Sequence, residues 1–503
     1  MRDNHEMREY VENHPMVETP PLDPRDAFFG GRTGNIVTRY EVTGTKKICY
    51  VDVCSLYPYV LKTSAFPIGH PDIYVGDECS TLIGSAPNYN FDRLEDLIWC
   101  KILPPRDLFY PVLPYRVKGK LLFALCRSCR ETFSQTSCTH ENASEREFKG
   151  TWVSCELRKA LEKDYLVTAV SEIWQYNVSQ FDRATRRDGL FAEYINTFLK
   201  LKQEASGWSS KCGENDDDAK EQYLWKYEEI EAIVLDRCNV ARNPGLRSVA
   251  KLCLNSFWRK FGQRSDLPNT KVVRTPQRLT LLTSAEHEIT DILLVNDEVV
   301  YVSWQMRQDA VVPSPLTNVV IAAYTTTQAC LKLYSYLERL DRRVLYYDTD
   351  SCIYKSSGDP HEYAPSTGNF LGDMTDKLES YSRDNYIEVF VSGGPKFYAY
   401  VVRTPDNRTH ECCKGISLNY ENSQLVNFNS IKNLLIAKEK MWENEDSEEV
   451  TIETSINLSF RAIRRTAFYE IITCDETKVC APVLLKRRFI YSRFSLPYGY
   501  VSE

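Results

Sequence analysis

Two short runs of the sequence carry acidic side chains in a pattern suited to metal-assisted phosphoryl transfer. Asp52 opens the run DVCSLYP, and Asp348 and Asp350 lie roughly 300 residues later in YYDTDS. Phosphoryl transfer needs mainly positioning and charge neutralisation, which carboxylates supply when they hold two Mg²⁺ ions beside the reacting oxygens. The three acids are therefore the predicted catalytic residues and the predicted magnesium ligands.

The elements around these acids are predicted to bring them together. Residues 46–53, KKICYVDV, form a short apolar run typical of a strand that ends near Asp52. Residues 342–347 and 351–355 predict two strands joined by a turn at Asp348-Thr-Asp350. Carboxylates at such a hairpin tip repel one another unless cations lie between them. Taken alone, Asp-Thr-Asp is an ordinary turn, so the prediction depends on both runs together.

A basic helix is predicted between the two acidic runs. Residues 244–261, PGLRSVAKLCLNSFWRKF, have apolar positions at helical spacing after a Pro-Gly start. Arg247, Lys251 and Asn255 are four residues apart and share one face, which can grip a triphosphate. Such a face is often merely solvated, but its place between the acidic motifs favours the phosphate-binding interpretation.

These motifs resemble those of one enzyme family. DxxSLYP, KxxxNSxW and YxDTDS, in this order, are similar to the three polymerase motifs of family B DNA polymerases. AFFGGRTGN (27–35) resembles the YxGG-type link of the protein-primed branch, GGPKFY (393–398) its KxY motif, and CKGISLN (413–419) its thumb entrance. With the GTW and PYGY runs, the chain is most similar to polymerases of Maverick/Polinton-type elements and of related viruses or linear plasmids.

The resemblance implies a fold and an activity. The expected fold is α+β, a right-hand polymerase with palm, fingers and thumb and an antiparallel palm sheet flanked by helices. The expected reaction is DNA-templated DNA synthesis, in which dNTPs extend a primer 3′-hydroxyl on primer-template DNA with two Mg²⁺ ions. Such an enzyme would replicate a mobile element or a viral genome, and a terminal protein is a candidate primer.

The resemblance also assigns roles to individual positions. Tyr57 would stack under the sugar and exclude a 2′-hydroxyl, and Phe28 stands where the family motif has Tyr. Nucleotide contacts are implied for Ser55, Leu56, Tyr57, Arg247, Lys251, Asn255 and Trp258. Template contacts are implied for Phe28, Gly30, Gly31 and Arg32, and primer contacts for Lys396 and Tyr398.

The sequence departs from the family pattern at two places. Arg259 stands where the family has Gly, and it either crowds the new base pair or extends the phosphate-gripping face of the helix. Reduced but not abolished synthesis is the expectation. Only about two dozen residues precede the YxGG-type link, which is too short for a folded nuclease domain, so no 3′–5′ exonuclease activity is expected.

The predicted domains follow the order of the motifs. Helices are predicted at 190–205, 219–235 and 318–340, and strands and turns at 263–316. The predicted units are an N-terminal tail (1–20), a first palm part (21–75), an insertion (76–187), fingers (188–262), a second insertion (263–316), the rest of the palm (317–412) and a thumb (413–503).

The first insertion contains a cysteine-rich motif with the spacing of a metal site. Cys126, Cys129, Cys138 and His140 follow the pattern C-x2-C-x8-C-x-H, with Cys155 as an alternative ligand. This spacing predicts one tetrahedral Zn²⁺, which would be structural because four protein ligands leave no open position. The alternative is a set of reduced thiols on a hairpin.

Composition places limits on the setting of the protein. The 17 cysteines occur without a secretory leader or a long apolar span, so free thiols in a reducing intracellular compartment, such as a nucleus or a virus factory, are expected, and no membrane partner. A net charge of −7 is unfavourable for a DNA-binding protein. Acidic runs at 214–218 and 443–449 carry much of it, and they are predicted on solvated loops away from the DNA.

Two other functions remain open from sequence alone. A nucleic-acid-binding relic that has lost catalysis is compatible with Arg259, although intact Asp52 and Asp350 weigh against it. A reverse transcriptase is the other alternative, but those enzymes typically have adjacent aspartates after the tyrosine rather than Asp-Thr-Asp.

Overall fold

A computed structural model shows how the motifs are arranged. It describes residues 21–86, 88–92, 94–208, 212–213, 216–264, 267–273, 284–296, 299–307, 317–381, 384–415, 419–443, 455–465, 471–490 and 493–502. The predicted tail (1–20), Ile416 to Leu418 of the thumb-entrance motif and most of the second acidic run lie outside these residues.

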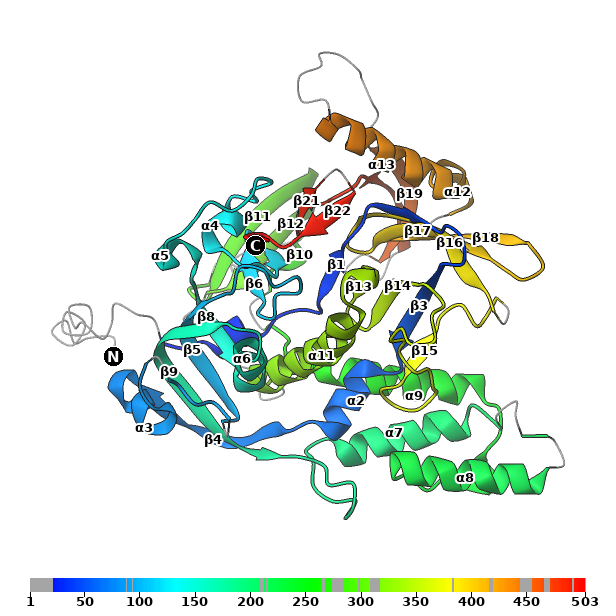
Figure 1. Cartoon of the computed structure of the whole chain (residues 1–503), viewed down its shortest axis with the longest axis horizontal. Helices are drawn as coiled ribbons and strands as arrows, with labels where there is room; N and C mark the ends of the chain where they lie inside the picture. The colour runs from blue at the N-terminus through cyan, green and yellow to red at the C-terminus, as the bar shows by residue number, and fades with distance from the viewer. Residues whose placement is uncertain are drawn as a thin grey trace.

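The centre of the fold is an antiparallel sheet that contains both acidic motifs (Figure 1). Its main path, within the described residues, runs in the order β1-β13-β14-β3-β16-β17-β18, while β15 pairs with β3 and β2 pairs with β16. The strands are β1 (Thr33–Asn35), β2 (Arg39–Glu41), β3 (Lys47–Val53), β13 (Val344–Asp348), β14 (Ser351–Ser356), β15 (Met374–Asp376), β16 (Tyr386–Gly394), β17 (Phe397–Arg403) and β18 (Thr409–Lys414).

A long helix, α11 (Val319–Leu340), packs beside this sheet and against α2 (Leu56–Thr63). The Asn318 side chain caps it by accepting a hydrogen bond from the Ile321 backbone N–H at 3.2 Å. Its apolar face is buried, with Leu333 and Leu337 fully inaccessible to solvent. Short 3-10 helices η2 (Pro24–Ala27) and η6 (Asp341–Arg343) lie at its two ends.

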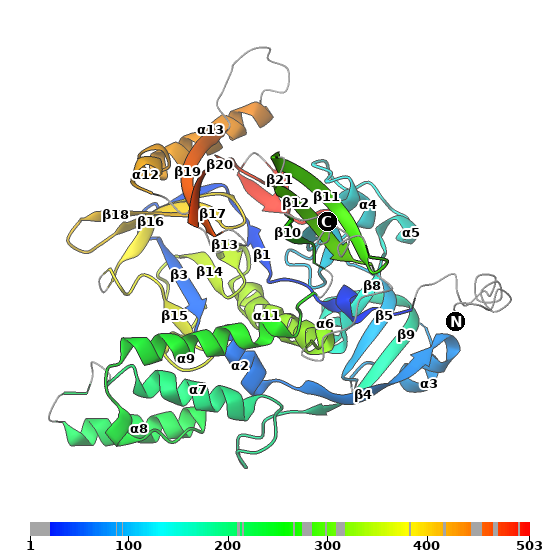
Figure 2. The same ribbon diagram turned by 180° about the vertical axis from the view of Figure 1, so that it is seen from behind.

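Three helices form a group below the palm sheet in Figure 1 and at the lower left in Figure 2. They are α7 (Ala192–Glu204), α8 (Asp217–Glu231) and α9 (Pro244–Ser256), followed by η5 (Phe257–Lys260), with η4 (Arg237–Asn239) before α9. The predicted fingers helices are thus found with small shifts at their ends. The described part of the first acidic run differs from the prediction, because Asp217 and Asp218 open α8 rather than a loop, although both remain exposed.

A separate four-stranded sheet, with the order β4-β9-β5-β8, lies on the other side of α11. Its strands are β4 (Phe66–Val75), β9 (Leu166–Ser179), β5 (Asp96–Leu103) and β8 (Phe148–Val153). The associated short elements are η3 (Gly76–Glu78), α3 (Cys79–Ile83), β6 (Tyr115–Val117), β7 (Lys120–Leu122), α4 (Arg127–Glu131), α5 (Ala143–Arg146) and α6 (Ser154–Leu161).

The remaining elements pack at the opposite edge of the palm sheet from the fingers helices (Figures 1 and 2). They are α12 (Tyr420–Leu425), α13 (Phe428–Glu443), and the hairpins of β19 (Ile456–Arg465) with β20 (Ile471–Cys480) and of β21 (Arg488–Ile490) with β22 (Phe494–Leu496). A three-stranded sheet of β10 (Asn269–Val273), β12 (Val299–Met306) and β11 (His287–Asn296) confirms the strands predicted at 263–316.

The α+β prediction is confirmed by this arrangement of an antiparallel sheet and flanking helices. The limits assigned to palm, fingers, thumb and insertions stay predictions. None of the described helices is both long and apolar enough to cross a membrane.

Candidate active site

The two acidic motifs meet on neighbouring strands. Strand β14 pairs with β3 so that Ser351 lies opposite Asp52, and the Val53 backbone N–H donates to the Asp350 carbonyl at 2.7 Å. Asp348 ends β13, on the other side of the hairpin. The structure therefore brings the three predicted acids to one edge of the palm.

The electrostatics of Asp350 reflect this convergence. Burial, together with the nearby charges of Asp52 and Asp348, raises the pKa of Asp350 to about 7. Among the described residues, the group whose ligand atoms all lie within 4.8 Å of one another is the Cys126 cluster, not these acids.

A lysine that the sequence did not single out pairs with the first acid. The Lys377 ammonium, just after β15, donates to the Asp52 carboxylate, and the Thr375 hydroxyl donates to the Asp52 carbonyl at 2.9 Å. Burial still raises the pKa of Asp52 above its usual value, although Lys377 and Lys251 oppose this shift. The Lys377 cation thus partly neutralises the Asp52 carboxylate at the site.

The turns of the site adopt an unusual backbone conformation. Ser55, Thr349 and Lys396 are non-glycine residues with φ of 52°, 56° and 62°. Such left-handed residues cost energy and cluster at functional sites. The Thr349 N–H donates to the Arg32 carbonyl at 2.8 Å, and a Cβ on Gly31 would lie 2.5 Å from the Thr349 hydroxyl. Gly31 is thus needed for close packing against the acidic turn.

Cations from two helices face the start of α2. Lys251 on α9 is exposed and lies within electrostatic reach of Asp52. Lys202 on α7 donates to the Ser55 hydroxyl at 3.3 Å, and burial, with a smaller effect of Arg247 and Lys251, lowers its pKa. Arg247 donates to the Ser206 hydroxyl at 3.2 Å. Arg247 and Lys251 thus both lie within electrostatic reach of Lys202, and the phosphate-binding role of this face of α9 stays a prediction.

The aromatic residues predicted to contact nucleotide lie together. Tyr57 and Trp258 stack with ring centroids 4.3 Å apart and an interplanar angle of 24°. Tyr57 is also within electrostatic reach of Asp350, and burial raises its pKa above the usual value. Asn255 is half-buried on the preceding turn of α9, whereas the Leu56 side chain is buried and can offer a ligand only its backbone.

The template-side prediction is corrected for one residue. Arg32 is only 1% exposed, its guanidinium lies 4.1 Å from the Phe123 ring centroid, and it donates to the Pro111 carbonyl at 2.7 Å. Because protein groups surround it, Arg32 supports the fold and does not present a free cation to DNA. Gly30, by contrast, is exposed, with no atom within 4 Å of an added Cβ.

Phe28 lies in a strongly basic pocket of about 640 Å³. A Cβ on Gly262 would lie 2.6 Å from the Phe28 ring, so glycine permits this close contact. Arg116 donates to the Phe28 carbonyl. Five cations line the pocket: Arg25, Arg116, Arg259, Lys260 and Arg264.

The predicted primer-side residues occupy the β16–β17 hairpin. The exposed Lys396 stands at its turn, with its backbone N–H bound to the Tyr346 hydroxyl at 2.7 Å. Tyr398 is nearly buried, and its hydroxyl lies 3.0 Å from that of Tyr50. Lys486, which the sequence did not indicate, donates to the Thr33 hydroxyl at 2.6 Å, and Thr33 lies opposite Asp348 in the sheet.

The four predicted zinc ligands also come together. His140 Nδ1 lies 3.5 Å from the sulfur of Cys126, 3.4 Å from that of Cys129 and 3.6 Å from that of Cys138. The alternative ligand, Cys155, is on α6 and is not in this cluster. We refer to Cys126, Cys129, Cys138 and His140 as the cysteine cluster.

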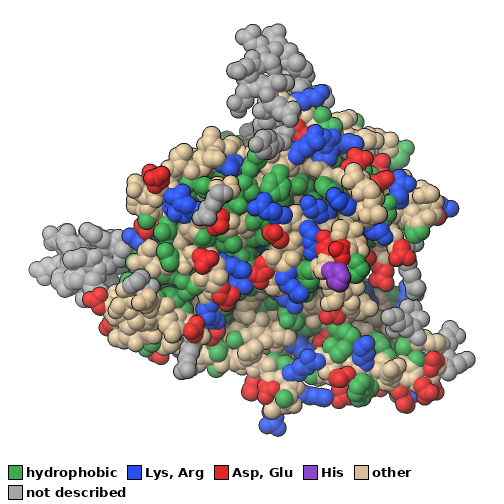
Figure 3. Space-filling model, viewed as in Figure 1, with side chains coloured by type: hydrophobic (Ala, Val, Ile, Leu, Met, Phe, Trp, Pro, Cys, Tyr) green, Lys and Arg blue, Asp and Glu red, His purple; other side chains and the backbone are tan. Residues whose placement is uncertain are grey.

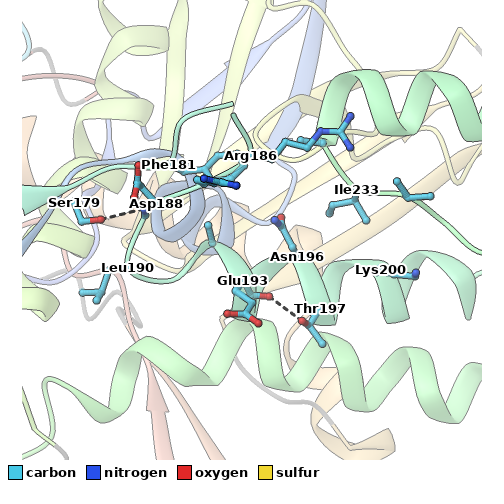
Figure 4. A pocket seen from close by; sticks show the side chains of 15 residues that line it. Ser179, Phe181, Arg186, Asp188, Leu190, Glu193, Asn196, Thr197, Lys200 and Ile233 are labelled. Carbon is cyan, nitrogen blue, oxygen red and sulfur yellow. Dashed lines mark hydrogen bonds between the residues drawn. The ribbon is translucent and has the colours of Figure 1, made fainter. Parts of the chain in front are cut away.

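A further cavity, of about 610 Å³, lies away from the acids. It is enclosed by α7, the segment before it and the residues after α8, and Figure 4 shows Glu193, Asn196, Thr197 and Lys200 of α7 along it. Its lining mixes both charge signs and contains none of the predicted site residues.

Comparisons with known proteins agree with this geometry. A family model for organellar and viral type B DNA polymerases matches residues 23–213. Phi29 DNA polymerase complexed with primer-template DNA and incoming nucleotides has a TM-score of 0.53 and 12% identity, over 92% of this chain and 63% of that chain. The chain has the fold of that polymerase.

Other structures of the same enzyme give similar values. Phi29 DNA polymerase with single-stranded DNA has a TM-score of 0.53 and 13% identity, over 92% of this chain and 63% of that one. Its orthorhombic crystal form has a TM-score of 0.52 and 12% identity, over 91% and 62%. The chain thus spans less than two thirds of the length of these structures. No relative among curated proteins matches it.

Proposed function

We propose that this protein is a DNA-templated DNA polymerase that adds dNMP from dNTP to a primer 3′-hydroxyl. The observation that carries the proposal is the Asp348-Thr-Asp350 hairpin paired to Asp52, because it brings three carboxylates from distant motifs to one edge. The polymerase family match and the Phi29-like fold support it.

The proposed metal chemistry uses two Mg²⁺ ions. Asp52, Asp348 and Asp350 would hold them, and the ions would stabilise charge on the attacking and leaving oxygens. The raised pKa of Asp350 supports cation binding, since a divalent ion would favour the ionised carboxylates. A structural Zn²⁺ at the cysteine cluster is part of the proposal and takes no part in the reaction.

Different protein groups would bind different parts of the nucleotide and the DNA. Lys202, Arg247 and Lys251 would neutralise the triphosphate, and the stacked Tyr57 would face the sugar. The pocket around Phe28, with its five cations, would take the single-stranded template, where arginines meet phosphates and the ring offers a stacking plane. Lys396 would hold the primer end.

We further propose that the substrate is the genome of a mobile element or virus and that a terminal protein serves as primer. The support is the set of protein-primed motifs, chiefly the Phe28 link and the Lys396-Phe-Tyr398 run. A radiolabelled dNTP assay with and without a candidate terminal protein would test this, since transfer of label to protein is expected only if its hydroxyl primes synthesis.

The polymerase proposal is tested by extending a labelled DNA primer on a DNA template with dNTPs or rNTPs. Incorporation of dNTPs in template order is expected, with rNTPs strongly disfavoured by Tyr57. Tight binding of the primer-template without any incorporation would instead identify the protein as a catalytically inactive relic.

A further inference from the structure

The distances from sulfur to nitrogen in the cysteine cluster match those of an occupied tetrahedral metal site. Bonds of about 2.3 Å to sulfur and 2.0–2.1 Å to nitrogen at tetrahedral angles place S and N about 3.6 Å apart. The three measured S···Nδ1 distances are 3.4–3.6 Å, and all four ligand atoms lie within 4.8 Å of one another. The three sulfurs are free thiols and are nearly inaccessible to solvent.

The ligands close a loop on the surface of the insertion. Cys126 caps α4 and Cys129 lies in its first turn, whereas Cys138 and His140 follow after the intervening loop. The His140 carbonyl accepts from Arg106 at 2.9 Å. Within the loop between Cys129 and Cys138, few backbone hydrogen bonds constrain residues 134–138. A metal that joins the two sulfurs would therefore set the loop conformation.

This loop contacts two described stretches that are distant in sequence, residues 482–490 and 493–501, which we call the C-terminal segment. Tyr498 is fully buried, packs edge-on against Phe133 at 6.1 Å and accepts from the Gln135 side chain at 3.4 Å. Gln135 also accepts from the Phe489 backbone N–H at 3.1 Å. Phe133 and Gln135 both lie in the loop between the metal ligands. The same loop therefore carries two metal ligands and the two residues that contact Tyr498.

The segment also touches a ligand directly. The Leu125 N–H donates to the Tyr498 carbonyl at 2.7 Å, and Gly499 has φ of 87°. A Cβ on Gly499 would lie 2.4 Å from Cys126 Cβ, so this position requires glycine. Displacement of Cys126 would therefore displace the backbone at Gly499.

The same segment then reaches the palm beside the acidic hairpin. The Ser495 N–H donates to the Ile36 carbonyl at 2.8 Å, next to β1. Lys486 binds Thr33 of β1 at 2.6 Å, and β1 pairs with β13, which ends at Asp348. A continuous set of contacts thus joins the cysteine cluster to the edge of the candidate active site.

We propose that Zn²⁺ bound by the cysteine cluster fixes the C-terminal segment to the palm and so holds Lys486 beside the acidic hairpin. The metal site and the fixing of the segment do not depend on the proposed polymerase activity. Only the effect of Lys486 on DNA synthesis rests on that function, because the lysine would face the primer side next to Lys396.

The test measures metal content and amide hydrogen exchange of the full chain. Protein purified with reductant and without added metal is expected to contain about one zinc per chain by elemental analysis. Removal of zinc with 1,10-phenanthroline, followed by dialysis, should speed exchange at residues 493–501 at least tenfold, and added Zn²⁺ should reverse it. Exchange in α7, remote from the cluster, is expected to stay unchanged.

Variants separate the metal from the cysteine side chains. Cys138→Ser should lose zinc and show the same faster exchange, whereas Cys155→Ser, which alters a cysteine outside the cluster, should keep both. If Cys138→Ser does not fold, the reversible removal of zinc from the unaltered chain still decides. Zinc below a tenth of an equivalent with no uptake on titration would overturn the site, and zinc loss without faster exchange at 493–501 would overturn the fixing role.

Discussion

The ionised form of Asp350 is disfavoured by burial and by the two neighbouring carboxylates. In the metal-free protein its pKa is about 7, against an ordinary value of 3.8, because it is buried beside two other carboxylates. The folded protein therefore keeps this proton to a higher pH than the unfolded chain. The contribution of Asp350 to the free energy of unfolding must fall as pH rises from about 4 to about 7.

Asp350→Asn removes this titration. We compare the free energy of unfolding of the variant with that of the unaltered chain, both without metal. The difference should shift in favour of the variant by up to about 4 kcal/mol between pH 4 and pH 8. Thermal unfolding in EDTA at the two pH values measures this. An equal difference at both pH values would show that Asp350 is not raised in pKa.

In the proposed mechanism, Lys377 would control how easily Mg²⁺ reaches Asp52. Because its ammonium competes with Mg²⁺ for one carboxylate, Lys377→Met should lower the Mg²⁺ concentration needed for half-maximal synthesis. Lys377 is half exposed, so the pair is worth at most about 1 kcal/mol and the shift should be about twofold to fivefold. Lys377→Arg should keep the original requirement, and a raised requirement in Lys377→Met would instead make Lys377 a substrate contact.

Helix α7 places Lys202 beside Ser55 in the candidate active site and Lys200 at the separate cavity. Lys202→Ala should raise the KM for dNTP by on the order of tenfold or more, because it removes a charge-assisted contact near Ser55. Lys200→Ala is the matched control, since Lys200 faces the separate cavity of Figure 4 and should leave KM unchanged. Equal effects of the two changes would indicate general loss of the helix.

The element after α9 places Arg259 in the pocket around Phe28, among four other cations. This position favours a phosphate contact over crowding of the base pair. Arg259→Gly should therefore weaken template binding and reduce the slope of log affinity against log salt by about one. Arg237→Ala, which removes a cation paired with Asp217, should change neither quantity. Faster synthesis by Arg259→Gly would support crowding instead.

Sequence periodicity predicted the elements of the site better than its individual contacts. The strand with Asp52 and the Asp348–Asp350 hairpin have apolar residues that are buried in the palm. The helix with Lys251 has apolar residues at helical spacing, although only Ala250 and Leu254 of α9 are buried. Lys202, Lys377 and Lys486 carry no such signal, because strand pairing and helix packing decide what they meet. The resemblance implies a template contact for Arg32, but the guanidinium lies over the rings of Phe123, Tyr334 and Tyr347.

At the scale of the whole molecule, charge is distributed unevenly despite the net value of −7. Figure 3 shows acidic side chains gathered at the end of the α7–α8 pair and basic ones over the face below α13. The exposed acids at the start of α8 therefore lie away from the palm edge that carries the acidic hairpin. Local positive charge at Lys202, Lys251 and the Phe28 pocket can bind nucleic acid in an acidic protein.

Asp52, Asp348 and Asp350 meet at one edge of the palm, where catalysis is proposed to take place. The most direct measurement is Mg²⁺-dependent primer extension by the unaltered chain, Asp52→Ala, Asp350→Ala and Asp359→Ala, the last an exposed carboxylate on a loop after β14. Template-ordered dNMP incorporation that requires Mg²⁺, is lost in the first two variants and is retained in the third is the expected result. Synthesis that persists in Asp52→Ala and Asp350→Ala would contradict a catalytic metal site at these acids.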